Sequence, residues 1–208
     1  GFKLMVSTVN KTKTEDSIKD LWGTSKDLKR DALYLYGRQV KTDVCSMAHN
    51  AQAMNYILPP DYIERMQNVA GWREREAFRK AEQDGYRCVA LDALMPSIEW
   101  GNDWFCNPPF SIELKKRFIR KAQAEKLRGN GGVMILPYVP ATDWWRQLLG
   151  KGVIVYEPDG RYNYIDQNGK LQKGCNFDSC VVVFPTFFIG DSIRIPYQRY
   201  IGRELNRV

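Results

Sequence analysis

Hydrophobic residues recur at two different spacings along the chain, and these spacings predict both helices and strands. Apolar positions three and four residues apart predict helices over 25–36, 113–128 and 141–149. Short runs rich in valine, isoleucine and aromatic residues predict strands over 40–45, 87–91, 104–106, 133–136, 153–156 and 179–184. Because strands alternate with helices before a strand-rich end, we expect an α/β protein. Its sheet should be mostly parallel, with an antiparallel C-terminal edge and helices on both faces.

Capping and turn residues set the limits of several of these elements. Ser25 can accept hydrogen bonds from the first turn of the first helix, and Gly37 can end that helix. Asn168-Gly169 is a favoured two-residue turn, so residues 161–176 are predicted to contain a β-hairpin.

The predicted helix over 113–128 has two contrasting faces. Its apolar stripe consists of Leu114, Phe118, Ala122 and Leu127, which should face the core. The remaining positions are mostly lysine and arginine. Such a basic face is either an ordinary solvated helix surface or a surface that meets phosphate groups.

Composition along the chain predicts three parts. Residues 1–20 are polar and rich in lysine and threonine, which indicates a flexible arm. Residues 21–190 should form a single domain, within which residues 61–86 are expected to be a helical insertion. Residues 191–208 are a basic C-terminal segment of undetermined structure.

Charge and residue counts narrow the classes of function. Lysine and arginine number 31 against 24 acidic residues, and this net charge of +7 favours a polyanionic partner without proving one. The single histidine, His49, argues against a His-rich metal site and is expected to be structural. The five cysteines form no C-x-x-C pair, so we expect reduced thiols and no metal. No apolar run approaches the roughly 18 residues of a membrane span.

The segment Asn-Pro-Pro-Phe at 107–110 is the strongest chemical signal in the sequence. Its prolines fix the backbone, so the carbonyl of Pro108 is rigidly aimed, and the Asn107 amide oxygen adds a second acceptor. With the ring of Phe110, these groups can hold a planar amine and aim its nitrogen at an electrophile. The alternative is a structural turn, which is what we expect of the other proline pair, at 59–60.

This segment resembles the catalytic motif of S-adenosylmethionine-dependent amino-methyltransferases. An ordered set of further matches over residues 21–185 resembles the phage-type, Dam-like DNA N-6-adenine methyltransferases. The matching segments are Leu21 to Thr24, Asp43 to Cys45, Asn50-Ala51, Tyr56, Asp92 to Leu94, Trp100, Trp104 to Phe110, Gly132 to Leu136, Thr142 to Trp144, Gly160-Arg161 and Val181 to Phe184. The chain departs from the pattern at Ser25 and Ala93, in the length of 61–86, and in lacking a glycine-rich cofactor loop.

The resemblance implies a Rossmann-like methyltransferase sheet, S-adenosylmethionine as the methyl donor, and no metal. The acceptor would be the N6 amine of an adenine flipped out of double-stranded DNA, modified in a bacterial cytoplasm. The catalytic residues it implies are Asn107, Pro108, Pro109 and Phe110. The cofactor-binding residues it implies are Trp22, Gly23, Thr24, Asp43, Cys45, Asp92 and Asn107.

Contacts with DNA are expected from charge, and the hairpin within 161–176 is a candidate for reading a groove. The basic residues expected to bind DNA are Lys115, Lys116, Arg120, Arg146, Arg161, Lys170 and Lys173.

Two other functions remain open from the sequence. The same motif serves amino-methyltransferases that act on protein glutamine, RNA or the N4 amine of cytosine. The other alternative is a non-catalytic DNA-binding phage protein that merely contains these four letters. The oligomeric state is not indicated.

Overall fold

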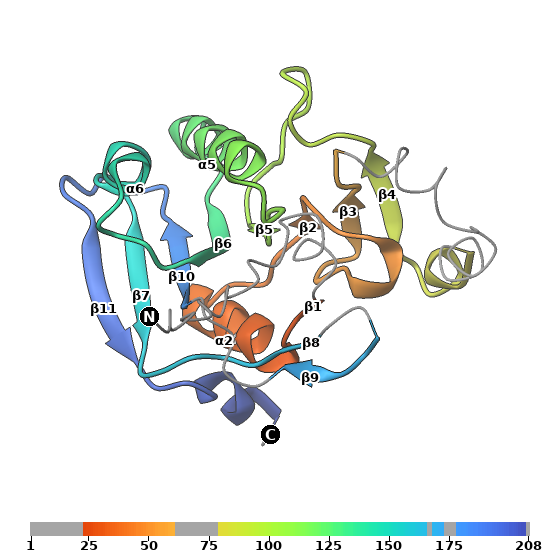
Figure 1. Ribbon diagram of the computed structural model, residues 1–208. Coiled ribbons are helices and arrows are strands. Elements are labelled where there is room, and N and C mark those ends of the chain that lie inside the picture. Colours follow the sequence, from red (N-terminus) through yellow and green to blue (C-terminus); the bar gives the residue numbers. More distant parts are fainter. Residues whose placement is uncertain (1–22, 61–78, 166–167, 173–177, 207–208) are drawn as a thin grey trace, which may run out of the picture.

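The computed structural model describes residues 23–60, 79–165, 168–172 and 178–206. These residues form two sheets, of eight and three strands (Figure 1). The large sheet has the order β11-β7-β10-β6-β5-β2-β3-β4. Its strands are β2 (Thr42–Asp43), β3 (Asn55–Ile57), β4 (Arg87–Ala90), β5 (Trp104–Cys106), β6 (Gly132–Pro137), β7 (Ile154–Pro158), β10 (Ser179–Phe184) and β11 (Ile193–Tyr197). The small sheet, of order β1-β8-β9, consists of β1 (Gly23–Thr24), β8 (Tyr164–Ile165) and β9 (Leu171–Gln172).

The pairing of the large sheet is mostly parallel. β10 runs antiparallel to both of its neighbours, β6 and β7, whereas the other pairings in the described sheet are parallel. The predicted fold class, a Rossmann-like methyltransferase sheet with antiparallel C-terminal strands, is confirmed. The reversed strand lies inside the sheet, because β7 and then β11 pair beyond it.

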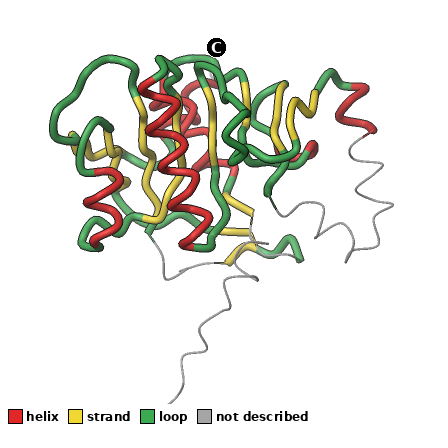
Figure 2. Tube along the Cα trace, turned by 90° about the horizontal axis from the view of Figure 1, so that it is seen from above, coloured by secondary structure: helices red, strands yellow, loops and turns green. Residues whose placement is uncertain are grey.

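Helices cover both faces of the large sheet (Figures 1 and 2). They are α2 (Lys26–Tyr36), α5 (Ile112–Leu127) and α6 (Asp143–Leu149), with short 3-10 helices η1 (Ala48–Asn50) and η2 (Ile201–Asn206). The predicted limits of α2 are confirmed: the Ser25 side chain accepts a hydrogen bond from the Leu28 amide at 3.2 Å. Gly37 ends the helix with a φ of 73°, a left-handed conformation that favours glycine.

Alternate residues of the central strands enter two different cores. On β10, Cys180, Val182 and Phe184 pack in the core that α5 and α6 cover. Val181 and Val183 pack on the opposite side, in the core that α2 covers. All six residues of β10 are buried. This is why its sequence is a continuous apolar run instead of alternating with polar residues.

One glycine is required by close packing within the sheet. A Cβ added to Gly132 would lie 2.2 Å from the Trp104 ring on the neighbouring strand. Trp104 is fully buried. Its ring packs edge to face against Trp100 and at a tilt against Phe184. A larger residue at 132 would therefore displace the strand that leads into the Asn-Pro-Pro-Phe segment.

The basic C-terminal segment continues the same fold. Ile193–Tyr197 adds β11 to the sheet by parallel pairing with β7, and η2 packs against α2. The segment 191–208, whose structure the sequence left undetermined, thus contributes to the fold as far as residue 206. The expected arm, 1–20, and residues 61–78 of the expected insertion lie outside the described residues. None of the helices in the described part of the chain is long and apolar enough to cross a membrane.

A buried carboxylate joins α2 to the C-terminal segment. Asp31 is fully buried and accepts hydrogen bonds from the backbone amides of Tyr200 and Gly202, each at 2.8 Å. It also accepts a bond from the Tyr162 hydroxyl, which in turn lies 2.7 Å from the Tyr197 hydroxyl. Three donors therefore depend on one side chain.

Replacing Asp31 by alanine should destabilise the protein strongly, because it removes the acceptor that the two backbone amides and the Tyr162 hydroxyl share. We expect the free energy of unfolding, measured in urea, to fall by about 3–5 kcal/mol. Asp143→Ala is the matched control, since its exposed ion pair with Arg146 should contribute less than about 1 kcal/mol. Equal losses in the two variants would contradict this assignment.

Candidate functional site

Three of the predicted site residues lie at one edge of the large sheet. Asp43 ends β2, Asp92 follows β4, and Asn107 follows β5. These strands are parallel and belong to the consecutive set β5-β2-β3-β4, so their carboxyl ends meet at the same edge. In open α/β sheets, ligands bind outside the carboxyl ends of the strands.

Asn107 is held by a residue that is distant in sequence. Its side-chain nitrogen Nδ2 donates a hydrogen bond of 2.6 Å to the hydroxyl oxygen of Thr24. This bond fixes the orientation of the amide and directs its Oδ1 atom elsewhere, as an acceptor. Asn107 is only partly buried. The structure therefore brings a predicted cofactor residue and a predicted catalytic residue into contact.

The small sheet supports this contact. Thr24 belongs to β1, which pairs antiparallel with β8, and β8 pairs antiparallel with β9. The predicted hairpin around Gly169, whose φ is 76°, is therefore present, and it is joined through β1 to the neighbourhood of Asn107. The sequence predicted the hairpin but not its pairing with β1.

Lys115 does not lie on the exposed surface that its charge predicted. It was expected to contact DNA, but it is 4% exposed, and its Nζ donates a hydrogen bond of 3.1 Å to the Phe110 carbonyl. The same nitrogen lies 5.0 Å from the centre of the Phe110 ring. The expectation of a DNA contact is thus wrong for this residue, because the first turn of α5 directs it toward the Asn-Pro-Pro-Phe segment. Pro109 is buried, whereas Pro108 and the Phe110 ring remain partly exposed.

Asp43, one of the predicted cofactor-binding residues, is buried and bonded to the backbone of the loop that follows it. It is 1% exposed and accepts hydrogen bonds from the backbone amides of Gln52, at 2.9 Å, and Cys45, at 3.3 Å. These bonds shape the loop that follows β2, where a glycine-rich loop is missing. Burial raises the pKa of Asp43 to about 6, although the two amides and the nearby Lys29 act in the opposite direction.

This raised pKa predicts a particular dependence of stability on pH. The folded protein holds the Asp43 proton more tightly than the unfolded chain, whose pKa is near 3.8. The resulting stabilisation is complete below about pH 4 and is lost as the pH rises through about 6, a change of about 3 kcal/mol. We expect wild type to lose stability relative to Asp43→Asn between about pH 4 and about pH 8 in urea unfolding. Parallel pH profiles for the two proteins would contradict this.

Asp92 is partly exposed in the segment after β4. Its Oδ1 accepts a hydrogen bond of 2.8 Å from the Leu94 amide, so the side chain forms a turn and retains a second oxygen. Cys45 is partly buried, and the four cysteines in the described residues form no disulfide. Trp22 lies outside the described residues, and the side chain of His49 is not described.

The other predicted DNA-binding residues are spread over the surface. Lys116 and Arg146 form ion pairs within their own helices, with Glu113 and Asp143, and Arg161 pairs with Asp178. Lys170 is exposed beside the turn of the hairpin. Lys173 lies outside the described residues.

Arg120 is exposed between two clefts on the outer face of α5. One cleft, of about 470 Å³, is also lined by Arg146 and Lys151. The other, of about 360 Å³, is also lined by Arg117 and Arg128. The basic face predicted for this helix is therefore present and open over these residues.

The comparison with curated proteins finds a distant relative. The chain is 25% identical over 174 residues to a DNA N-6-adenine-methyltransferase of Haemophilus phage HP1 (strain HP1c1). The alignment covers 79% of this chain and 82% of that protein. No family model matches the chain. The predicted resemblance is confirmed: this chain, which has a Rossmann-like sheet, is a distant relative of a phage DNA adenine methyltransferase.

Proposed function

We propose that the chain transfers a methyl group from S-adenosylmethionine to the N6 amine of adenine in double-stranded DNA. The observation that carries the proposal is the Asn107 amide at the carboxyl end of β5, oriented by Thr24 and followed by two prolines and a partly exposed phenylalanine. The distant relationship to a phage DNA adenine methyltransferase supports the same activity.

The chemistry of the carboxyl edge suits S-adenosylmethionine. The ribose hydroxyls and amines of this cofactor are hydrogen-bond donors, and the edge offers the Asp92 carboxylate and the loop shaped by Asp43. In the proposal, Trp22, Gly23, Thr24, Asp43, Cys45, Asp92 and Asn107 form the cofactor site. When bound, the cofactor supplies an electrophilic methyl group attached to sulfur.

The chain's own residues would hold and aim the acceptor amine. Adenine cannot be reached inside a duplex, so it must first be flipped out, at a cost of a few kcal/mol. The Asn107 Oδ1 atom and the Pro108 carbonyl accept the two N–H bonds of its amine. Phe110 stacks on the base, which contributes roughly 1–3 kcal/mol. This arrangement directs the nitrogen lone pair toward the methyl group. As the N–C bond formed, the S–C bond would break, leaving S-adenosylhomocysteine, and the displaced proton would leave to water.

DNA would approach the same edge of the sheet. Exposed Arg120 and the partly exposed Lys116 on α5, with Arg146 on α6, are proposed phosphate contacts. Arg161, Lys170 and Lys173 are proposed to contact DNA from the segment 161–176, and we propose that its hairpin reads a groove. Lys115 is excluded from this set because it is buried.

The test is incorporation of labelled methyl groups from S-adenosylmethionine into duplex DNA, followed by digestion to nucleosides. N6-methyladenine as the labelled product is the expected result. Labelled N4-methylcytosine, or label in protein or RNA but not DNA, would replace this proposal with another amino-methyltransferase. Wild-type protein that binds DNA but shows no binding of the cofactor by calorimetry would favour a non-catalytic DNA-binding protein.

A further inference from the structure

Residues 91–103 connect β4 to β5, two strands of the large sheet, and contain no helix. A helical crossover satisfies its own backbone groups, whereas an irregular one needs other partners for its carbonyls. Internal bonds hold part of the segment, including the Trp100 indole N–H to the Ala93 carbonyl at 3.0 Å. Ala93, Leu94 and Trp100 are buried and anchor it to the core.

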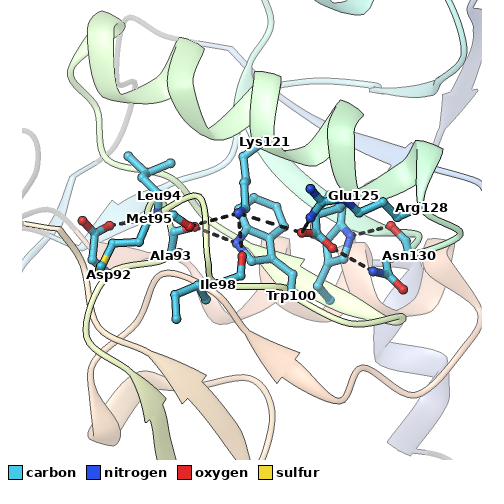
Figure 3. Close-up of polar contacts among 11 residues, drawn as sticks. Asp92, Ala93, Leu94, Met95, Ile98, Trp100, Lys121, Glu125, Arg128 and Asn130 are labelled. Atoms are coloured by element: carbon cyan, nitrogen blue, oxygen red, sulfur yellow. Dashed lines mark hydrogen bonds and ion pairs between the residues drawn. The ribbon is translucent and has the colours of Figure 1, made fainter.

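The outer part of this segment is held differently. Residues 95–97 are exposed, so little apolar contact fixes them. Lys121 of α5 reaches across and donates hydrogen bonds to the carbonyls of Met95, at 3.2 Å, and Ile98, at 2.5 Å (Figure 3). Its side chain is 11% exposed. One ammonium group therefore fastens the tip of the segment to the helix.

A buried carboxylate in turn holds Lys121. Glu125, one turn further along α5, is fully buried, and its Oε2 accepts a hydrogen bond of 2.8 Å from Asn130. Its Oε1 has no hydrogen-bond partner among the described residues but lies 4.0 Å from the Lys121 nitrogen and 3.6 Å from that of Arg128. A buried charge is costly unless opposite charges surround it. Figure 3 shows Lys121 between the segment and this carboxylate.

We propose that Lys121, held by Glu125, is a positioning residue that fixes segment 92–98 in the shape in which Asp92 meets the cofactor. The inference rests on the proposed function and adds to it a residue that touches neither cofactor nor base. Because the buried anchors remain when Lys121 is lost, the segment should loosen locally while the fold persists. Loss of Lys121 should therefore weaken cofactor binding more than it slows chemistry.

Lys121→Met removes the charge and donors but keeps the length of the side chain. We expect the Kd for S-adenosylmethionine, measured by calorimetry without DNA, to rise by about tenfold or more. The KM for the cofactor should rise in parallel, with kcat within about twofold of wild type. The backbone amides of Leu94, Met95, Ser97 and Ile98 should exchange hydrogen faster in the free variant. Lys121→Arg, which restores charge and donors, should recover most of the affinity.

Arg117→Met is the matched control, because Arg117 lies on the same helix and lines the same cleft but is exposed. It should bind the cofactor as wild type does. A folded Lys121→Met with wild-type Kd, or with a lower kcat and an unchanged KM, would overturn the inference. If Lys121→Met does not fold, Glu125→Gln decides: a raised Kd supports the inference and an unchanged one overturns it. If calorimetry shows that the wild-type protein does not bind S-adenosylmethionine, the proposed function itself is wrong. This result is obtained before any variant is compared.

Discussion

Replacing Asn107 by alanine should lower methyl transfer to DNA by about a thousandfold, since it removes a preorganised acceptor from the reacting amine. The side chain is partly exposed, and its polar contact within the described part of the chain is the bond to Thr24, so its loss should barely change the free energy of unfolding. Affinity for S-adenosylmethionine should fall much less than kcat, because the acceptor oxygen that is lost bonds the base and the other residues of the proposed cofactor site remain. Single-turnover incorporation of labelled methyl groups measures the effect directly.

Two further variants sharpen this result. Asn107→Asp retains an acceptor oxygen but loses the N–H that bonds Thr24, so it should be intermediate in rate. Gln83→Ala removes an exposed amide on another part of the chain and should leave the rate unchanged. Near-normal turnover by a folded Asn107→Ala protein would remove the central residue from the proposed mechanism.

The sequence predicted the central strands well because both of their faces are covered. Val181 to Phe184 is a continuous apolar run for this reason, and it is a strand as expected. The Asn-Pro-Pro-Phe segment was also predictable, since its chemistry is local and the strand before it is short and buried. Asp92 and Asn107 meet at one edge because parallel strands end there, a consequence of topology that the alternation of elements already implied.

The buried face of α5 was predicted only in part. Phe118 and Ala122 are buried as expected, but Leu127 at the end of the helix is 86% exposed. Lys115 and Glu125 are buried instead, because each bonds a group that lies just beyond one end of the helix: the Phe110 carbonyl and the Asn130 side chain. Hydrophobic spacing carries no signal for a buried charge. The partners of such charges become visible only when the chain is folded.

The contact between Thr24 and Asn107 spans 83 residues, and no spacing rule would have found it. Removing this contact by substitution of Thr24 is therefore expected to lower the rate of methyl transfer strongly. Thr24→Val keeps the shape of the side chain but removes the hydroxyl, so the Asn107 amide loses the partner that fixes its orientation. With the amide free to turn, its N–H₂ group can point at the amine in place of the acceptor oxygen, and kcat should fall by about ten- to a hundredfold.

Thr24→Ser restores the hydroxyl and should recover most of this rate. Thr186→Val is the control: it removes an exposed hydroxyl from the loop after β10 and should leave kcat unchanged. If Thr24 acts on the amide, adding Thr24→Val to Asn107→Ala should cost almost nothing further, because the group that it orients is already gone. If Thr24 acts on the cofactor alone, the two losses should multiply, and the KM for S-adenosylmethionine should rise in the single variant. Rates and KM values for the two single variants and the double variant therefore separate orientation of the amide from direct contact with the cofactor.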